Sequence, residues 1–199
     1  MKILVVYTHP VPDSYNRSVL NSVKAGLEAA GHEYQVADLY QENFQPAMTA
    51  EDFNQFDNQP MPDDIVKEQA RVEWSDGIVF VFPVWWWSMP GMLKGWIDRV
   101  MSYGWAWIDP ADPDSGFLKS RKILVLATAG GTEDVFKKRK YDESFYTQLT
   151  IGTWDYCGFK EVTTEVLYGI APGASEKHLQ SQIDRAGFLA KTVFGKSES

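Results

Sequence analysis

The chain has 199 residues, a formal net charge of −8 and an aromatic content of 14%. This length suits one domain, residues 1–199, with a sizeable core, and the aromatic content argues against a disordered or coiled-coil chain. The acidic balance, with no basic stripe, makes nucleic acid and anionic membrane surfaces poor partners.

Cysteine content restricts the chemistry further. The single cysteine, Cys157, excludes an internal disulfide and a cysteine-built metal centre, and we expect no metal. Its neighbours Tyr156 and Phe159 indicate a buried, unreactive thiol. There is no secretory signal pattern and no apolar run long enough to span a membrane, so we expect a cytoplasmic protein without a membrane span.

The first elements alternate between strand and helix. Residues 3–7 are apolar throughout, which is typical of a buried parallel strand, and residues 8–14 form a loop. The apolar spacing over 15–30 predicts a helix that Gly31 ends. A second strand is predicted over 33–39.

A long acidic stretch follows, over residues 40–63, and it contains several prolines. Such a length without regular structure indicates a functional excursion or part of a subunit interface. A helix over 64–74 and a buried strand over 77–82 come next. Pro83 ends this strand because proline has no backbone N–H to donate.

Three tryptophans, Trp85 to Trp87, follow directly at the carboxyl end of that strand. Pro90 then precedes a stretch with helical apolar spacing that reaches Val100. In open α/β sheets, ligands bind at the carboxyl ends of the strands. Core packing would account for one tryptophan, but the cluster favours a flat aromatic ligand. The remaining predicted elements are a strand over 122–128, a helix over 141–156, a strand over 162–168 and a helix over 175–194.

This alternation predicts an α/β protein with a parallel sheet and right-handed crossovers. The loops after the first, third and fourth strands then meet at one edge. In the first loop, His9, Ser14 and Asn16 precede or open a helix, whose free N–H groups suit a phosphate. Ser14 alone is more often a simple helix cap. The sequence has no G-x-G-x-x-G and no P-loop motif, so it supports neither corresponding nucleotide fold.

The third of these loops places two glycines, Gly130 and Gly131, after the strand that ends at Thr128. Taken alone, this is an ordinary tight turn, although glycine also lets backbone N–H groups approach a planar ligand. Together with Pro83–Trp87, the loop forms two walls of one slot. A flavin ring fits such a slot because it stacks on tryptophan and accepts backbone hydrogen bonds.

Residues 82–100, Phe-Pro-Val-Trp-Trp-Trp-Ser-Met-Pro-Gly-Met-Leu-Lys-Gly-Trp-Ile-Asp-Arg-Val, resemble the signature of the NAD(P)H:quinone oxidoreductase family, the DT-diaphorase-like flavoproteins. The resemblance implies a flavodoxin-like three-layer sandwich with a five-stranded parallel sheet in the order 2-1-3-4-5. It also implies a homodimer and two-electron ping-pong reduction of quinones or related electrophiles by NADPH or NADH. Further segments that resemble the family are His9 with 14–16, 62–69, 128–131 and 156–159.

The resemblance also assigns residues to the site. Trp87, Trp105 and Trp107 are expected to contact the substrate, the last two from the partner subunit. The alternative for those two is surface packing in a dimer, which would also need a partner subunit. The residues expected to hold the flavin are His9, Ser14, Tyr15, Asn16, Pro83, Val84, Trp85, Trp86, Trp87, Thr128, Ala129, Gly130, Gly131 and Phe136.

One departure from the family concerns catalysis. Better-known members have a tyrosine and a histidine, six residues apart, shortly after the double glycine, and this chain has Phe136 and Asp142 there. Tyr141 is our candidate catalytic residue. The basic run 137–140 could instead stabilise a reduced flavin, or it could be a solvated surface.

The cofactor and the activity have alternatives. The family contains both FAD and FMN users, and the long 40–63 stretch resembles that of the FAD users, so FAD is expected and FMN is the alternative. Reduction of azo or nitro compounds would use the same slot. A regulatory flavoprotein subunit of a transport protein and a one-electron carrier are the remaining alternatives.

Overall fold

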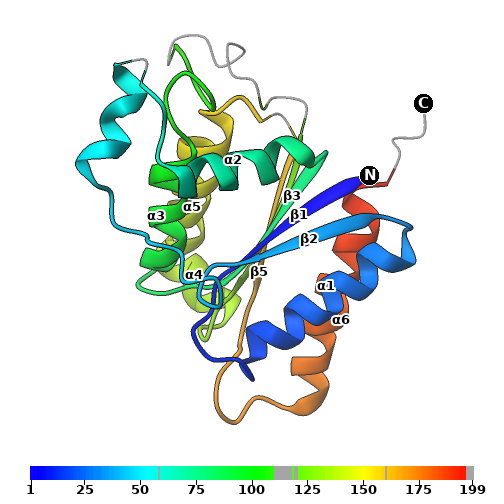
Figure 1. Ribbon diagram of the computed structural model, residues 1–199. Coiled ribbons are helices and arrows are strands. Elements are labelled where there is room, and N and C mark those ends of the chain that lie inside the picture. The colour runs from blue at the N-terminus through cyan, green and yellow to red at the C-terminus, as the bar shows by residue number, and fades with distance from the viewer. Residues whose placement is uncertain (58, 110–117, 119–120, 160, 196–199) are drawn as a thin grey trace.

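The computed structural model describes residues 1–57, 59–109, 118, 121–159 and 161–195 (Figure 1). Within these ranges the elements follow one another as strand and helix in alternation, as the hydrophobic pattern predicts. The sequence also predicts a turn-rich stretch over 109–116 and a frayed tail over 195–199, and most of these residues lie outside the described ranges.

Five strands form one parallel sheet. They are β1 (Lys2–Tyr7), β2 (Glu33–Asp38), β3 (Gly77–Pro83), β4 (Lys122–Thr128) and β5 (Glu161–Leu167). Their order is β2-β1-β3-β4-β5, which confirms the predicted flavodoxin-like topology. The register aligns the ends of the central strands, with Pro83 opposite Thr128 and Tyr7 opposite Val81. The loops that follow these strands therefore start side by side.

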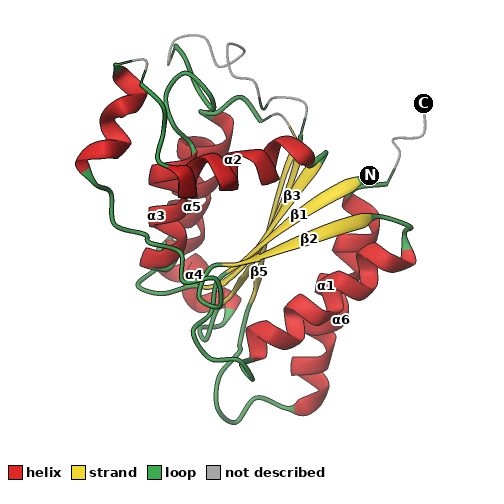
Figure 2. Cartoon of the chain, viewed as in Figure 1, coloured by secondary structure: helices red, strands yellow, loops and turns green. Residues whose placement is uncertain are grey.

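Helices cover both faces of the sheet (Figure 2). On one face lie α1 (Tyr15–Ala29) and α6 (Glu176–Val193), packed against each other. The other face is covered by α2 (Asp63–Trp74), α3 (Gly91–Val100), α5 (Tyr141–Tyr146) and the π-helical turn η3 (Thr147–Asp155). Burial on both faces explains why the three central strands, β1, β3 and β4, are nearly continuous apolar runs.

The pleat of β1 divides its side chains between two cores. Ile3 and Val5 pack toward α1 and α6, whereas Leu4 and Val6 pack toward the opposite layer. In that layer Phe80 stacks on Trp154 with ring centroids 4.6 Å apart. The two cores hold the sheet rigid beneath its carboxyl edge.

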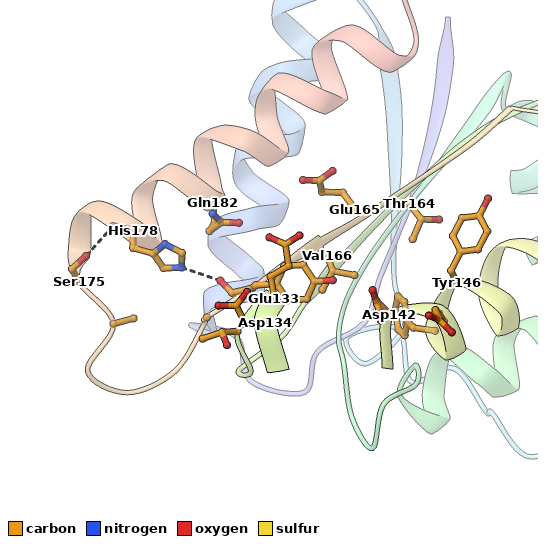
Figure 3. A pocket seen from close by; sticks show the side chains of 16 residues that line it. Glu133, Asp134, Asp142, Tyr146, Thr164, Glu165, Val166, Ser175, His178 and Gln182 are labelled. Atoms are coloured by element: carbon orange, nitrogen blue, oxygen red, sulfur yellow. Dashed lines mark hydrogen bonds between the residues drawn. The ribbon is translucent and has the colours of Figure 1, made fainter. Parts of the chain in front are cut away.

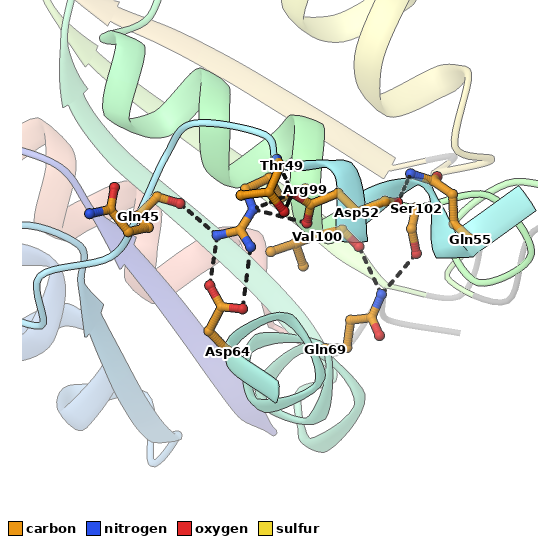
Figure 4. Close-up of polar contacts among 9 residues, drawn as sticks. All are labelled: Gln45, Thr49, Asp52, Gln55, Asp64, Gln69, Arg99, Val100 and Ser102. Carbon is orange, nitrogen blue, oxygen red and sulfur yellow. Dashed lines mark hydrogen bonds and ion pairs between the residues drawn. The ribbon is translucent and has the colours of Figure 1, made fainter. Parts of the chain in front are cut away.

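The stretch 40–63 is anchored to α3 rather than standing free. It contains the 3₁₀ helix η1 (Ala50–Phe56) and is tied down by Arg99, which is 3% exposed (Figure 4). Arg99 Nε donates to Asp52 Oδ1 at 3.0 Å, and its Nη1 donates to the Gln45 carbonyl at 2.7 Å. A second carboxylate, that of Asp64, lies 2.6 Å from Nη1.

Backbone packing completes this anchor. A Cβ placed on Gly95 of α3 would lie 2.1 Å from the carbonyl oxygen of Pro46, so only glycine allows this approach. We call the contacts of Arg99 and Gly95 with residues 45–64 the excursion anchor.

Two helical details were missed in the sequence. The helix α4 (Glu133–Arg139) occupies the stretch after the double glycine, where we predicted only a turn and a basic run. Its acidic first turn and basic last turn agree with the helix dipole, but its length of 7 residues is too short to show periodicity. The predicted helix over 141–156 is present as α5 followed by η3, whose wider turns place Gly152 in the second part.

Candidate functional site

The loops after β1, β3 and β4 are joined by hydrogen bonds at the carboxyl edge of the sheet. The Asn16 side chain donates to Thr128 Oγ1 at 2.9 Å in a buried contact between the first and third loops. The backbone N–H of Val84 donates to the Thr128 carbonyl at 2.8 Å, and that of Thr8 donates to the Val81 carbonyl at 3.0 Å. The predicted convergence of the three loops is therefore present.

The first loop ends at the N-terminus of α1. Ser14 is the N-cap and accepts from the backbone N–H of Arg17 at 3.3 Å. The first turn of this helix contains no acidic residue, so the positive end of its dipole faces the loop uncompensated. This arrangement suits an anion such as a phosphate.

An unsatisfied hydroxyl lies in the same loop. Thr8 is fully buried, and its Oγ1 has no hydrogen-bond partner among the residues that the structure describes. Buried hydroxyls are seldom left unpaired, because desolvation without a partner costs about 1–3 kcal/mol. The orphaned oxygen beside the helix N-terminus therefore fits a ligand that supplies hydrogen-bonding oxygens.

Two predicted residues of this loop use their side chains within the protein. The Tyr15 hydroxyl donates to the Leu179 carbonyl at 2.7 Å, and burial, followed by Asp184, raises the pKa of Tyr15 to about 12. His9 Nδ1 accepts from the backbone N–H of Val11 at 3.1 Å. The Tyr15 contact locks the start of α1 onto α6 and leaves the backbone N–H groups of α1 to face the loop.

The second loop is a tight turn of tryptophans. Trp85 and Ser88 exchange backbone hydrogen bonds of 3.0 and 3.1 Å, and the central residues Trp86 and Trp87 have φ values of 49° and 62°. Positive φ at both central positions is the pattern of a type I′ turn, which normally requires glycine or asparagine. Bulky residues held this way cost about 1–3 kcal/mol each and cluster at ligand sites.

Trp86 is 93% exposed, whereas Trp85 and Trp87 are each 41% exposed. A pocket of about 230 Å³ opens between this turn and the third loop. It brings together six of the predicted flavin-binding residues with Phe136, also predicted. The lining residues are Val84, Trp86, Trp87, Ala129, Gly130, Gly131 and Phe136.

Gly130 provides a test of what this pocket accepts. A Cβ on Gly130 would meet only the Ile170 carbonyl, at an ordinary 3.6 Å, and its φ lies outside the left-handed region. The fold therefore does not need glycine here, and the missing side chain leaves the backbone open to a ligand. An aromatic wall, an open backbone and a nearby phosphate-type helix terminus together fit a flavin.

A larger pocket of about 1180 Å³, the acidic pocket, is lined by several carboxylates, among them Glu133, Asp142 and Glu165 (Figure 3). It adjoins the smaller pocket through the ring contact between Tyr168 and Phe136. Tyr168 forms part of its wall; burial raises the pKa of Tyr168, and the carboxylates of Asp142, Glu133 and Glu165 raise it further.

The loop after β5 borders this pocket and was not assigned to the site from sequence. His178 Nε2 lies 2.9 Å from the Tyr168 carbonyl, and Tyr168 packs edge-on against Phe136 at 5.1 Å. The sequence could have indicated this loop as part of the site, because it follows a parallel strand and therefore starts at the same edge of the sheet.

The two residues that replace the family pair, Phe136 and Asp142, lie in different pockets. Phe136 lines the smaller pocket, and the candidate catalytic residue Tyr141 stacks on Trp87 beside it. Asp142 lines the acidic pocket instead, and its Oδ1 is buried without a partner among the described residues. In the basic run, Lys137 pairs with Glu133 at 2.6 Å on the surface of α4, so its charge is already compensated.

Trp105 and Trp107 lie away from the tryptophan turn. Trp105 Nε1 donates to Glu73 at 2.8 Å, and Trp107 lines a separate pocket of about 450 Å³ with Phe56 and Tyr156. Cys157 is buried beside it, as predicted, and burial raises the pKa of its thiol to about 12. Within one chain these tryptophans therefore do not join the 230 Å³ pocket.

Two structural expectations concern absences. In the part of the chain that the structure describes, no helix combines the length and apolar character that crossing a bilayer requires. The same residues contain no group of three or more histidine, cysteine or carboxylate side chains arranged to hold a metal ion.

Comparisons with known proteins agree with this geometry. A family described as having a flavodoxin-like fold matches residues 1–188. The ribosyldihydronicotinamide dehydrogenase [quinone] of Mus musculus is 33% identical over 196 residues, which cover 88% of this chain and 85% of that protein. The human protein of the same name is 32% identical, with 95% and 87% covered.

Among solved structures, the NAD(P)H:quinone oxidoreductase from Methanothermobacter marburgensis superimposes with a TM-score of 0.90 at 30% identity, covering 100% of this chain and 98% of that one. An FMN-dependent NADH-azoreductase from Bacillus anthracis, at 18% identity and a TM-score of 0.68, shares the fold, with 95% and 97% covered. The chain thus belongs to the flavodoxin-like family of NAD(P)H:quinone oxidoreductases.

Proposed function

We propose that this protein is a flavin-dependent oxidoreductase that reduces quinones with NADPH or NADH. The observation that carries the proposal is the 230 Å³ pocket between the strained tryptophan turn and the open backbone at Gly130. The family relationship supports it, because relatives named as quinone-dependent dehydrogenases match most of the chain.

The phosphate end of the cofactor would bind at the start of α1. The helix N-terminus and the hydroxyl groups of Ser14 and Thr8 supply donors there, and no carboxylate in the first turn opposes an anion. FAD and FMN share this phosphate and the ring, so both fit these two ends of the site. We propose FAD as the cofactor, with FMN as the alternative.

The ring end would lie between the two loops. Trp86 and Trp87 offer faces for stacking, and the backbone N–H groups of Gly130 and Gly131 can donate to the ring edge. When bound, the flavin supplies the two-electron chemistry that takes a hydride from NAD(P)H and passes it, with a proton, to a quinone to give a hydroquinone.

We also propose that the active unit is a cytoplasmic homodimer. Phe53, Phe56 and Tyr156 are exposed aromatic residues around the 450 Å³ pocket that Trp107 lines. Such a contiguous apolar surface is typical of an interface. In such a dimer, Trp105 and Trp107 of one subunit would lie near the tryptophan turn of the other subunit and contact the substrate there.

The proposal is tested by flavin binding and turnover in matched variants. Gly130→Val should fold normally, because its Cβ meets no close neighbour, yet its side chain would fill the ligand's approach and abolish flavin binding. Gly91→Ala, at a position with open space around it, is the control and should bind flavin like the parent protein.

The parent protein should copurify with or take up FAD or FMN, identified by chromatography of the released cofactor, and oxidise NADPH or NADH only when a benzoquinone is present. Flavin binding by Gly130→Val with the affinity of the parent protein would contradict this placement of the ring.

A further inference from the structure

Tyr141 packs face to face on Trp87. Their ring centroids are 3.7 Å apart and the planes differ by 18°, the shortest ring separation among the residues that the structure describes. Phe136 meets both rings edge-on, at 5.8 Å from Trp87 and 5.9 Å from Tyr141. The three side chains form one aromatic cluster at the end of the 230 Å³ pocket.

The backbone is bent to make this contact. Lys140, between α4 and α5, has a φ of 59°, in the left-handed region that lysine seldom adopts. This bend lets Phe136 of α4 and Tyr141 of α5 face the same indole. Trp87 itself has a left-handed backbone, so a strained residue stands on each side of the stack.

Tyr141 contributes its ring to these contacts and not its hydroxyl. Within the described residues, the Tyr141 hydroxyl and the Trp87 indole N–H have no hydrogen-bond partner, whereas the Tyr15 hydroxyl donates to a carbonyl. Trp87 lines the 230 Å³ pocket, and Tyr141 is not among its lining residues. The ring contacts are therefore what holds the partly exposed indole in one orientation.

We propose that Tyr141 is a positioning residue: its ring fixes the indole of Trp87 as a preformed wall of the flavin pocket, and its hydroxyl is not needed. This inference rests on the proposed function. A fixed wall raises affinity for a planar ligand because the side chain loses less freedom on binding. A catalytic hydroxyl at Tyr141, our expectation from the sequence, is the competing assignment.

The experiment measures the dissociation constants of FAD and FMN for the apoprotein by quenching of flavin fluorescence. Tyr141→Phe keeps the stack and should bind like the parent protein, whereas Tyr141→Leu should bind about threefold to tenfold more weakly, the range expected for losing an aromatic pair. Tyr146→Leu, in the same helix but facing the acidic pocket, is the control and should not change affinity.

A double-mutant cycle tests whether Tyr141 acts through Trp87. Adding Tyr141→Leu to Trp87→Leu should cause no further loss of affinity, because the indole that Tyr141 positions is already gone. Additive losses would overturn the inference. If Tyr141→Leu does not fold, Tyr141→Gln replaces it, since a polar side chain suits a partly exposed helix start.

Further outcomes separate this inference from the proposed function. If Tyr141→Phe binds flavin normally, but NADPH reduces its bound flavin at least tenfold more slowly in stopped-flow measurements, the hydroxyl is assigned to catalysis and the positioning role is overturned. Equal flavin affinity in the parent protein and Tyr141→Leu would overturn the inference alone. A parent protein that binds no flavin would overturn the inference together with the proposed function.

Discussion

The excursion anchor holds residues 45–64 on α3, whereas the tryptophan turn is the loop that follows β3, and the two differ in how their polar and apolar groups are satisfied. In the anchor, the Arg99 guanidinium is buried and paired with Asp52, Asp64 and a backbone carbonyl. In the turn, Trp86 is almost fully exposed on a strained backbone, and Thr8 nearby keeps an orphaned hydroxyl.

This difference distinguishes side chains that stabilise the fold, such as Arg99, from side chains that are available to bind a ligand, such as Trp86. A buried charge is tolerated only when its partners are present, so the anchor is complete within the chain. Exposed aromatic rings and unpaired donors are unfavourable unless another molecule covers them. Variants in the anchor should therefore change stability, whereas variants in the turn should change binding.

The largest expected effect is at Arg99. Arg99→Met would leave the Asp52 carboxylate, which is 0% exposed, without its partner, and should lower the free energy of unfolding by about 3–5 kcal/mol. Urea denaturation measures the loss. The control is Lys94→Met, which breaks an exposed pair with Asp98 and should change stability by less than about 1 kcal/mol. Equal effects of the two changes would show that the anchor is not the buried pair that we describe.

A smaller loss is expected at Gly95. In Gly95→Ala the new methyl group would collide with the Pro46 carbonyl, and displacing residues 45–64 should lower stability by about 1–3 kcal/mol. Gly91→Ala, on the same helix with open space around it, should be neutral or stabilising by up to about 1 kcal/mol. Thermal denaturation distinguishes the two, and a stable Gly95→Ala protein would contradict the close approach.

In the turn, stability and binding should change in opposite directions. Trp86→Asn removes an exposed ring and places a residue that tolerates positive φ, so stability should rise by about 1 kcal/mol while flavin affinity falls. Trp85→Asn relieves no such strain and should gain no stability. Denaturant unfolding and flavin titration on the same samples test both. A loss of stability in Trp86→Asn would show that the ring supports the fold.

The smallest effect concerns the single thiol. Burial raises the pKa of Cys157 to about 12, above the ordinary value, so its unreactive thiol form predominates at pH 8. Iodoacetamide should therefore leave the folded protein unmodified, by mass spectrometry, and react fully in urea. Rapid labelling of the folded protein would place Cys157 in an exposed site.

Regular elements were predictable because each depends on a local pattern. Short apolar runs such as 122–128 indicate buried strands, and the alternation of strand and helix then favours a parallel sheet. The tryptophan cluster was predicted to follow the third strand at the carboxyl edge, and the 230 Å³ pocket opens beside it. What could not be predicted depends on single three-dimensional contacts: the bend at Lys140, the stack of Tyr141 on Trp87, and the pairing of Arg99 with Asp52, which lies 47 residues away in sequence.

Short elements were also hidden. The helix α4 has only Val135 and Phe136 as apolar residues, too few to show a period. The basic run gave no sign that Lys137 pairs with Glu133 along that helix. Trp105 and Trp107 are expected site residues, but within one chain Trp107 lines a different pocket and Trp105 donates to Glu73. Their proposed role depends on a second copy, which the sequence of one chain cannot place.

The most direct test of the central claim is an anaerobic titration of the purified, flavin-loaded protein followed by visible absorbance. We predict that one equivalent of NADPH or NADH removes the flavin absorbance in a single two-electron step, and that one equivalent of benzoquinone restores it. A protein that takes up no flavin from excess FAD or FMN, or whose bound flavin neither nicotinamide cofactor reduces, would contradict this prediction.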